Sequence, residues 1–134
     1  MEAFIGTWTF VESDNFEPYL KALGIAAPLR KLANLTTPTV IISDLGNGEY
    51  SVKTDAVVRS VVVTFKFGEK VGETTVDFRK VESVFTLEDD TLVWTSTDKN
   101  GLTTVVRRTI SSEGIMLVEM EVRGITATAK FKKS

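Results

Sequence analysis

The chain has 134 residues, a formal net charge of −2 at neutral pH, and neither cysteine nor histidine. This length suits a single domain, residues 1–134, which can bury roughly two thirds of its unfolded surface. The charge balance and the absence of a basic run argue against a nucleic-acid partner. The absence of cysteine and histidine removes two of the commonest nucleophile or base partners and the usual transition-metal ligands. We therefore expect no enzyme, no metal site and no cofactor.

No apolar run is long enough to cross a membrane as a helix, and the N-terminus lacks the charged, apolar, small-residue progression of a signal peptide. The absence of cysteine fits a reducing compartment. We expect a soluble, cytoplasmic protein that is a monomer.

The first residues predict a strand with one bulky face. Phe4, Trp8 and Phe10 alternate with smaller or polar neighbours, and this period of two is typical of a strand that turns one face towards an interior. The alternation ends near Asp14. The chain then changes from strand to helix.

A short helix is predicted directly after this strand. Asp14 and Glu17 have the spacing of a capping box, and Pro18 falls in the first turn, where a missing backbone donor is tolerated. Gly24 supplies a left-handed end to the helix. Four apolar residues follow the helical period: Phe16, Tyr19, Leu20 and Leu23.

A second short helix is predicted to begin near Pro28, because proline is favoured in the first helical turn. Its apolar side consists of Leu29, Leu32, Ala33 and Leu35. The two helices, at about residues 15–35, would cover the open end of a barrel. They fit a fixed plug and a movable lid equally well.

From Thr39 onwards, turn signals recur about every 8–12 residues, which predicts an antiparallel barrel or sandwich of about ten strands in all. Two C-terminal strands have one dry and one wet face. The dry residues are Met116, Val118, Met120, Val122, Ile125, Ala127, Ala129 and Phe131. The stretch 57–67 has no polar face, and we interpret it as a bulged or corner strand.

The N-terminal motif resembles that of the cytosolic fatty-acid-binding and retinoid-binding proteins, a branch of the calycin superfamily. The matching residues are Gly6, Trp8, Phe10, Asn15, Phe16, Glu17, Tyr19, Leu20 and Leu23, followed by similar segments at 65–69 and 73–83. The resemblance implies an all-β fold. It would be a ten-stranded antiparallel clam-like β-barrel with a two-helix lid between the first and second strands.

Two adjacent arginines lie in one predicted strand, so one points inward and the other outward. Alternation alone does not choose between Arg107 and Arg108, because Val105 and Val106 give both faces an apolar neighbour. The resemblance favours Arg107 as the internal cation that binds a ligand carboxylate. A structural ion pair with an internal acid such as Asp77 is the alternative.

The C-terminus departs from the pattern of many relatives. Where they carry an Arg-x-Tyr triplet that binds a carboxylate, this chain has Ala129, Lys130 and Phe131. The resemblance is therefore closer to the intestinal-type arrangement, although relatives of that type keep an arginine at the position of Ala129. Lys130 is expected to point outward.

The resemblance also implies a set of residues around the ligand, each of which also fits ordinary core packing. Val58 stands where many relatives have a phenylalanine at the entrance. The expected cavity and tail contacts are Phe16, Tyr19, Leu20, Val58, Asp77, Arg79, Trp94, Ser96, Val118, Met120 and Phe131. Three basic residues are expected near the entrance: Lys21, Arg30 and Lys31.

These features predict an intracellular carrier for a long-chain fatty acid. Carriage of retinoic acid or another hydrophobic ligand is an alternative. So is a membrane-docking role, with transient contact between the entrance cations and anionic lipid. Two residue pairs contain acids that could act in catalysis: Asp77 with Arg79, and Glu119 with Glu121. Neither pair has a nucleophile beside it, so we do not expect catalysis.

Overall fold

The computed structural model describes residues 1–34, 37–56, 59–76 and 78–134. A short 3₁₀ helix, η1 (Glu2–Phe4), opens the chain, and two helices follow the first strand. The helices are α1 (Phe16–Ala22) and α2 (Ala27–Asn34). The strands are β1 (Gly6–Asp14), β2 (Thr39–Gly46), β3 (Glu49–Asp55), β4 (Ser60–Lys66), β5 (Lys70–Thr74), β6 (Lys80–Glu88), β7 (Thr91–Asp98), β8 (Thr103–Ile110), β9 (Met116–Val122) and β10 (Ile125–Lys133).

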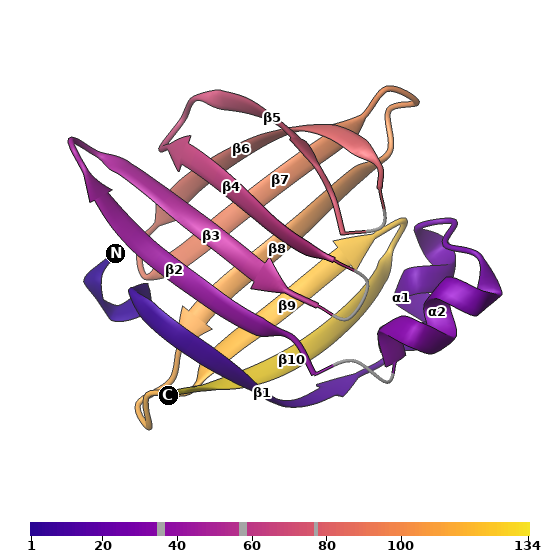
Figure 1. Ribbon diagram of the computed structural model, residues 1–134, viewed down its shortest axis with the longest axis horizontal. Helices are drawn as coiled ribbons and strands as arrows, with labels where there is room; N and C mark the ends of the chain where they lie inside the picture. Colours follow the sequence, from indigo (N-terminus) through magenta and orange to yellow (C-terminus); the bar gives the residue numbers. More distant parts are fainter. Residues whose placement is uncertain (35–36, 57–58, 77) are drawn as a thin grey trace.

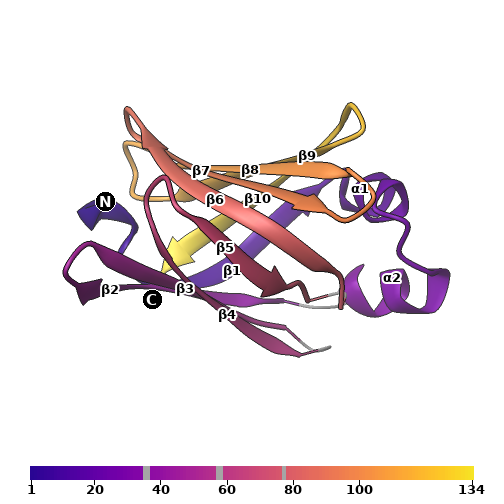
Figure 2. The same cartoon turned by 90° about the horizontal axis from the view of Figure 1, so that it is seen from above.

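The ten strands form one antiparallel sheet in the order β4-β3-β2-β1-β10-β9-β8-β7-β6-β5. Strands that follow one another in the chain are paired, except that β4 and β5 are not hydrogen-bonded to each other, and β1 also pairs with β10. The sheet curls round until its edge strands β4 and β5 face each other (Figures 1 and 2). The result is the predicted clam-like barrel, with α1 and α2 between β1 and β2 in the chain.

The predicted two-face pattern of the C-terminal strands is confirmed. In β10, Ala127, Ala129 and Phe131 are buried, whereas the residues between them are exposed. Lys130 points outward, and its ammonium lies 3.2 Å from a carboxylate oxygen of Glu12 on β1. A period of two therefore separates a dry interior from a wet exterior.

The bulge predicted for residues 57–67 is wrong for the described part of that stretch. β4 pairs with β3 in unbroken register, and Val62 points outward with 58% of its surface exposed. Val61 and Val63 point the other way, so the valine run alternates normally. The bulges lie elsewhere, between Phe10 and Glu12 on β1 and next to Gly46 on β2.

One end of the barrel is packed with large side chains. The indole nitrogen of Trp8 donates a 2.8 Å hydrogen bond to the carbonyl oxygen of Phe4 in η1. Phe65 stacks on Phe85 with ring centroids 3.8 Å apart, and Phe85 stacks on Trp94 at 5.5 Å. The most buried members of this core are Trp8, Ile42, Phe85, Leu92 and Met116.

The helices lie at the opposite end of the barrel from η1 (Figure 1). The predicted capping box is wrong: the residue that caps α1 is Asn15, in the left-handed region, and no side chain caps the helix. Asn15 instead donates to the carbonyl oxygen of Thr126 on β10. Gly24 has the predicted left-handed conformation, with φ of 84°. Among the described residues no helix has the length and apolar character needed to span a membrane.

Candidate functional site

A cavity of about 290 Å³ lies inside the barrel beneath α1 and α2. Most of its wall is apolar, and the wall draws on both helices and on strands from both halves of the sheet. Most of the residues expected to touch a ligand line it. They are Phe16, Tyr19, Leu20, Arg79, Trp94, Ser96, Val118, Met120 and Phe131. Val58 and Asp77, which were expected there too, lie outside the described residues.

The prediction that Arg107 is the internal cation is wrong. Its side chain is 41% exposed, and its guanidinium lies 3.2 Å from Glu119 and 3.6 Å from Glu121 on the outer face of β9. The reason is register: Arg107 pairs with Glu119, whereas Arg108 pairs with the buried Val118. The outward arginine therefore shares a face with acids.

Arg108 is the arginine inside the barrel. Only 5% of its surface is exposed, and it lines the cavity with Thr104 and Val106 of the same strand. Its guanidinium carbon lies 5.8 Å from the ring centroid of Trp94. Nε and Nη1 of Arg108 have no hydrogen-bond partner within the described ranges. Burial lowers the pKa of Arg108 to about 10, and the nearby charge of Glu73 opposes this effect. The side chain is therefore a charged, undersaturated donor at neutral pH.

Glu73 on β5 is the acidic residue that lines this cavity with Arg108, and the sequence analysis did not single it out. Its Oε2 is buried and forms no hydrogen bond within the part of the chain that the structure describes. Burial raises the pKa of Glu73, while the donors of Ser83 and Trp94 and the charge of Arg108 act in the opposite direction. Ser83 Oγ and Trp94 Nε1 lie close enough to affect this pKa, but neither atom forms a hydrogen bond with a described group. The four side chains come from the adjacent strands β5, β6, β7 and β8.

The last strand adds no polar group at this level of the cavity. Ala129 and Phe131 both line it, and Phe131 packs edge-on against Phe10 with ring centroids 5.7 Å apart. On β7 and β8, the hydroxyls of Ser96 and Thr104 form a hydrogen bond with each other at 2.5 Å, and both residues line the cavity. Most of the cavity wall is suited to a hydrocarbon chain, and the charged side chains among its described lining residues are Glu73, Arg79 and Arg108.

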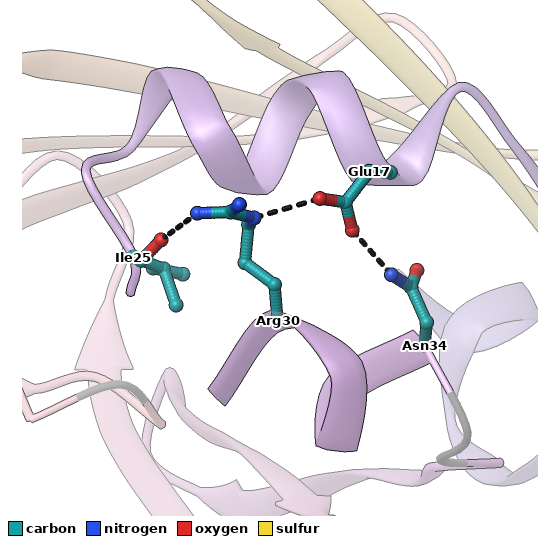
Figure 3. A network of polar contacts seen from close by, with 4 residues as sticks. All are labelled: Glu17, Ile25, Arg30 and Asn34. Carbon is teal, nitrogen blue, oxygen red and sulfur yellow. Dashed lines mark hydrogen bonds and ion pairs between the residues drawn. The ribbon is translucent and has the colours of Figure 1, made fainter. Parts of the chain in front are cut away.

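A polar network joins the two helices above the cavity (Figure 3). Arg30 Nε donates to a carboxylate oxygen of Glu17 at 2.7 Å, and Arg30 Nη1 donates to the carbonyl oxygen of Ile25 at 2.6 Å. Asn34 donates to the other carboxylate oxygen of Glu17. The hydrogen bond from Arg30 is the main reason that the pKa of Glu17 is lowered. Glu17 thus clamps α2 to α1.

The three basic residues expected at the entrance fall into two groups. Lys21 and Lys31 are exposed on the helices, whereas Arg30 belongs to the clamp between them. The surface cation set is therefore smaller than the sequence indicated.

Of the two residue pairs named for catalysis, Glu119 with Glu121 lies on the outer face of β9. Glu119 and Glu121 neutralise Arg107 outside the barrel, and Asp77 lies outside the described residues. Over the described ranges, no cluster of three or more acidic, histidine or cysteine side chains is arranged to hold a metal ion.

Comparison with known proteins gives one consistent result. The family model described as "Lipocalin / cytosolic fatty-acid binding protein family" matches residues 5–131. Human fatty acid-binding protein 9 is 36% identical over 133 residues, covering 99% of this chain and 98% of that protein. The crystal structure of Echinococcus granulosus fatty-acid-binding protein 1 superposes with a TM-score of 0.94 at 31% identity, covering 99% of this chain and 98% of the other.

A second solved structure was obtained with a ligand. The Schistosoma mansoni fatty acid binding protein in complex with arachidonic acid superposes with a TM-score of 0.93. It is 32% identical and covers 100% of this chain and 98% of its own.

Proposed function

Because this chain belongs to the lipocalin / cytosolic fatty-acid-binding protein family, we propose that it is a non-enzymatic cytoplasmic carrier of long-chain fatty acids. The fatty acid binds non-covalently in the barrel cavity, with its carboxylate at Arg108 and its hydrocarbon chain beneath α1 and α2. The protein then transports it between membranes and enzymes. The arachidonic acid complex of the Schistosoma relative supports this ligand class.

The observation that carries the proposal is Arg108. A guanidinium that is almost fully buried in an apolar cavity, with two nitrogens that lack partners among the described residues, is a preformed anion site. A carboxylate matches its planar fork and can accept two parallel hydrogen bonds. The ligand would supply the acceptors that the described side chains do not.

The two parts of the ligand would contribute differently. Burying a chain of roughly 16–18 carbons yields about 0.8 kcal/mol per methylene, or about 12 kcal/mol before ordering and association costs. Removing one partner of a buried charged pair typically costs about 2–5 kcal/mol. The chain therefore supplies most of the affinity, and Arg108 fixes the orientation of the head group.

Titration with a fluorescent fatty acid and displacement by oleate tests the proposal. We expect a stoichiometry near one. Because about 1.4 kcal/mol corresponds to a tenfold change, Arg108→Leu should weaken oleate binding by about 30-fold or more. Arg107→Leu is the matched control and should change the affinity by less than about threefold, since its guanidinium lies outside the barrel.

Two results would contradict the proposal. One is a folded protein that ignores fatty acids at micromolar concentration. The other is an equal effect of the two arginine substitutions. Competition between oleate and retinoic acid in the same assay separates a fatty-acid carrier from a retinoid carrier.

A further inference from the structure

Few charged side chains line the cavity. Among the described residues that line it, only Glu73, Arg79 and Arg108 carry a charged side chain. Arg79 lies in the link between β5 and β6, and its carbonyl oxygen accepts a hydrogen bond from the backbone N–H of Thr75. Arg108 and Glu73 line the same cavity from β8 and β5, and the charge of each acts on the pKa of the other. When Glu73 is ionised, the charges of these two side chains sum to zero.

A fatty-acid carboxylate would disturb this balance. It would bring a second negative charge to Arg108, next to Glu73, in a largely apolar cavity. When two carboxylates share one cation in an apolar cavity, their mutual repulsion and their burial raise the pKa of one of them. That carboxylate then tends to take up a proton. The last strand offers no second cation inside, since Ala129 and Phe131 line the wall there.

We propose that Glu73 is the residue that sets the charge specificity of the site, and that a carboxylate ligand binds Arg108 only as Glu73 takes up one proton from solvent. This inference depends on the proposed fatty-acid binding. The reaction is balanced: an ionised acid, a proton and the Glu73–Arg108 pair give the acid anion on Arg108 beside a neutral Glu73 carboxyl group. No covalent bond other than the O–H bond of Glu73 forms.

The surroundings of Glu73 favour proton uptake at this residue. Burial raises its pKa by more than the donors of Ser83 and Trp94 and the charge of Arg108 lower it, and its buried Oε2 has no hydrogen-bond partner among the described residues. The facing groups are Ser83 on β6, Trp94 on β7 and Arg108 on β8. Arg108 is the only one of the three that is charged, and the ligand would compete for it.

Glu73 is also placed where a proton can reach it. It lines the inner cavity and, at the same time, a groove between the edge strands β4 and β5. Arg59, which directly precedes β4, also lines this groove. Its guanidinium carbon lies 4.9 Å from the ring centroid of Phe78. Because β4 and β5 are not hydrogen-bonded to each other, we expect solvent protons to reach Glu73 through this groove without passing the helices.

The proposal fixes the sign of the pH dependence. A proton taken up on binding makes the affinity rise as the pH falls, by at most tenfold per pH unit. The rise occurs between the pKa of Glu73 in the complex and its lower pKa in the free protein. Oleate stays ionised between pH 6 and 8, because a free carboxyl group titrates at about 4–5. Oleamide, which has the same chain and an uncharged head group, should bind without pH dependence.

Calorimetric titration of the wild-type protein with oleate provides the test. Matched titrations at pH 7 in phosphate and in Tris, whose ionisation enthalpies differ, give the number of protons bound. We expect a value between zero and one, clearly above zero, and an affinity that falls from pH 6 to pH 8. A proton count of zero with normal oleate binding overturns this inference alone, whereas no oleate binding at any pH overturns the proposed function as well.

Three variants separate this role of Glu73 from a structural one. Glu73→Gln should bind oleate without proton uptake and at pH 8 at least as tightly as the wild type does. Ala129→Arg adds a second cation on the cavity wall and should also abolish proton uptake while Glu73 stays in place. Glu119→Gln removes a carboxylate outside the barrel and should leave the proton count unchanged. If Glu73→Gln weakens binding at every pH and the Ala129→Arg variant still takes up a proton, the proposal is wrong.

Discussion

The two ends of the barrel are built differently. Near η1, large side chains fill the interior, with Trp8, Phe85 and Leu92 at most 1% exposed. Beneath α1 and α2, the same sheet surrounds a cavity whose wall includes the buried cation Arg108. The packed end stabilises the fold without contributing a ligand group. The hollow end gives up that packing and in return has room for a ligand.

The largest difference between the two ends should appear when one large side chain is removed from each. Phe85→Ala opens a void between Phe65 and Trp94 and should lower the free energy of unfolding by about 3–5 kcal/mol. Leu29→Ala, on the cavity side of α2, should lower it by about 1 kcal/mol or less, since the site is already hollow. Urea unfolding measures both values. Equal losses would show that the hollow end carries as much stability as the packed end.

The second prediction removes the charges from the hollow end. Replacing Arg108 by Met and Glu73 by Leu together should raise the free energy of unfolding by about 1–4 kcal/mol, because buried charged groups are often less stabilising than apolar side chains of similar size. The same protein should lose its preference for oleate over oleamide. Thermal and urea unfolding check the first statement, and paired titrations check the second. A less stable double variant would mean that the pair supports the fold.

A smaller effect is expected on the outside of β8. Arg107→Gln breaks the ion pairs with Glu119 and Glu121, which are solvent-exposed and salt-screened. The free energy of unfolding should change by about 1 kcal/mol or less, and the change should shrink in high salt. Urea unfolding at two salt concentrations measures this. A loss as large as that of Phe85→Ala would contradict the distinction between the two faces of the strand.

The smallest effect on global stability is expected at the clamp between the helices. The pKa of Glu17 is lowered in the folded protein, mainly by the hydrogen bond from Arg30, so the contribution of the clamp is present above the ordinary value of 4.5. It is lost as the pH falls through the lowered pKa. Amide chemical shifts of α2, followed by NMR from pH 6 to pH 3, should change in this window. In Glu17→Gln the titration should vanish while urea unfolding stays almost unchanged; a persisting titration would assign it to another group.

Much of the fold could be predicted from the sequence because the signals were local. The alternation in β9 and β10, the turn signals and the left-handed Gly24 each depend on a few neighbouring residues, and the structure confirms them. The capping-box prediction was wrong because it, too, considered only neighbouring residues. Glu17 has the right spacing from Asp14, but Arg30 and Asn34 approach from a helix further along the chain and bind its carboxylate instead.

The choice between Arg107 and Arg108 was within reach of the sequence. The turn at Glu113 and Gly114 joins β8 to β9, and a hairpin centred there pairs position 107 with position 119. Since Glu119 was already expected on the wet face, Arg107 belongs outside with it. Resemblance to relatives gave the opposite answer, because a matched motif does not fix the register of a strand.

The sequence by itself determined the class of the molecule: a period of two, repeated between turns, makes one face of each strand apolar and so predicts a barrel with an interior. Only the tertiary structure decided which charges lie in that interior. Glu73 and Arg108 are 35 positions apart in the sequence. They line the same cavity because β5, β6, β7 and β8 lie side by side in the sheet. The pKa of each residue depends on its burial and on the charge of the other, and a local stretch of sequence determines neither of these.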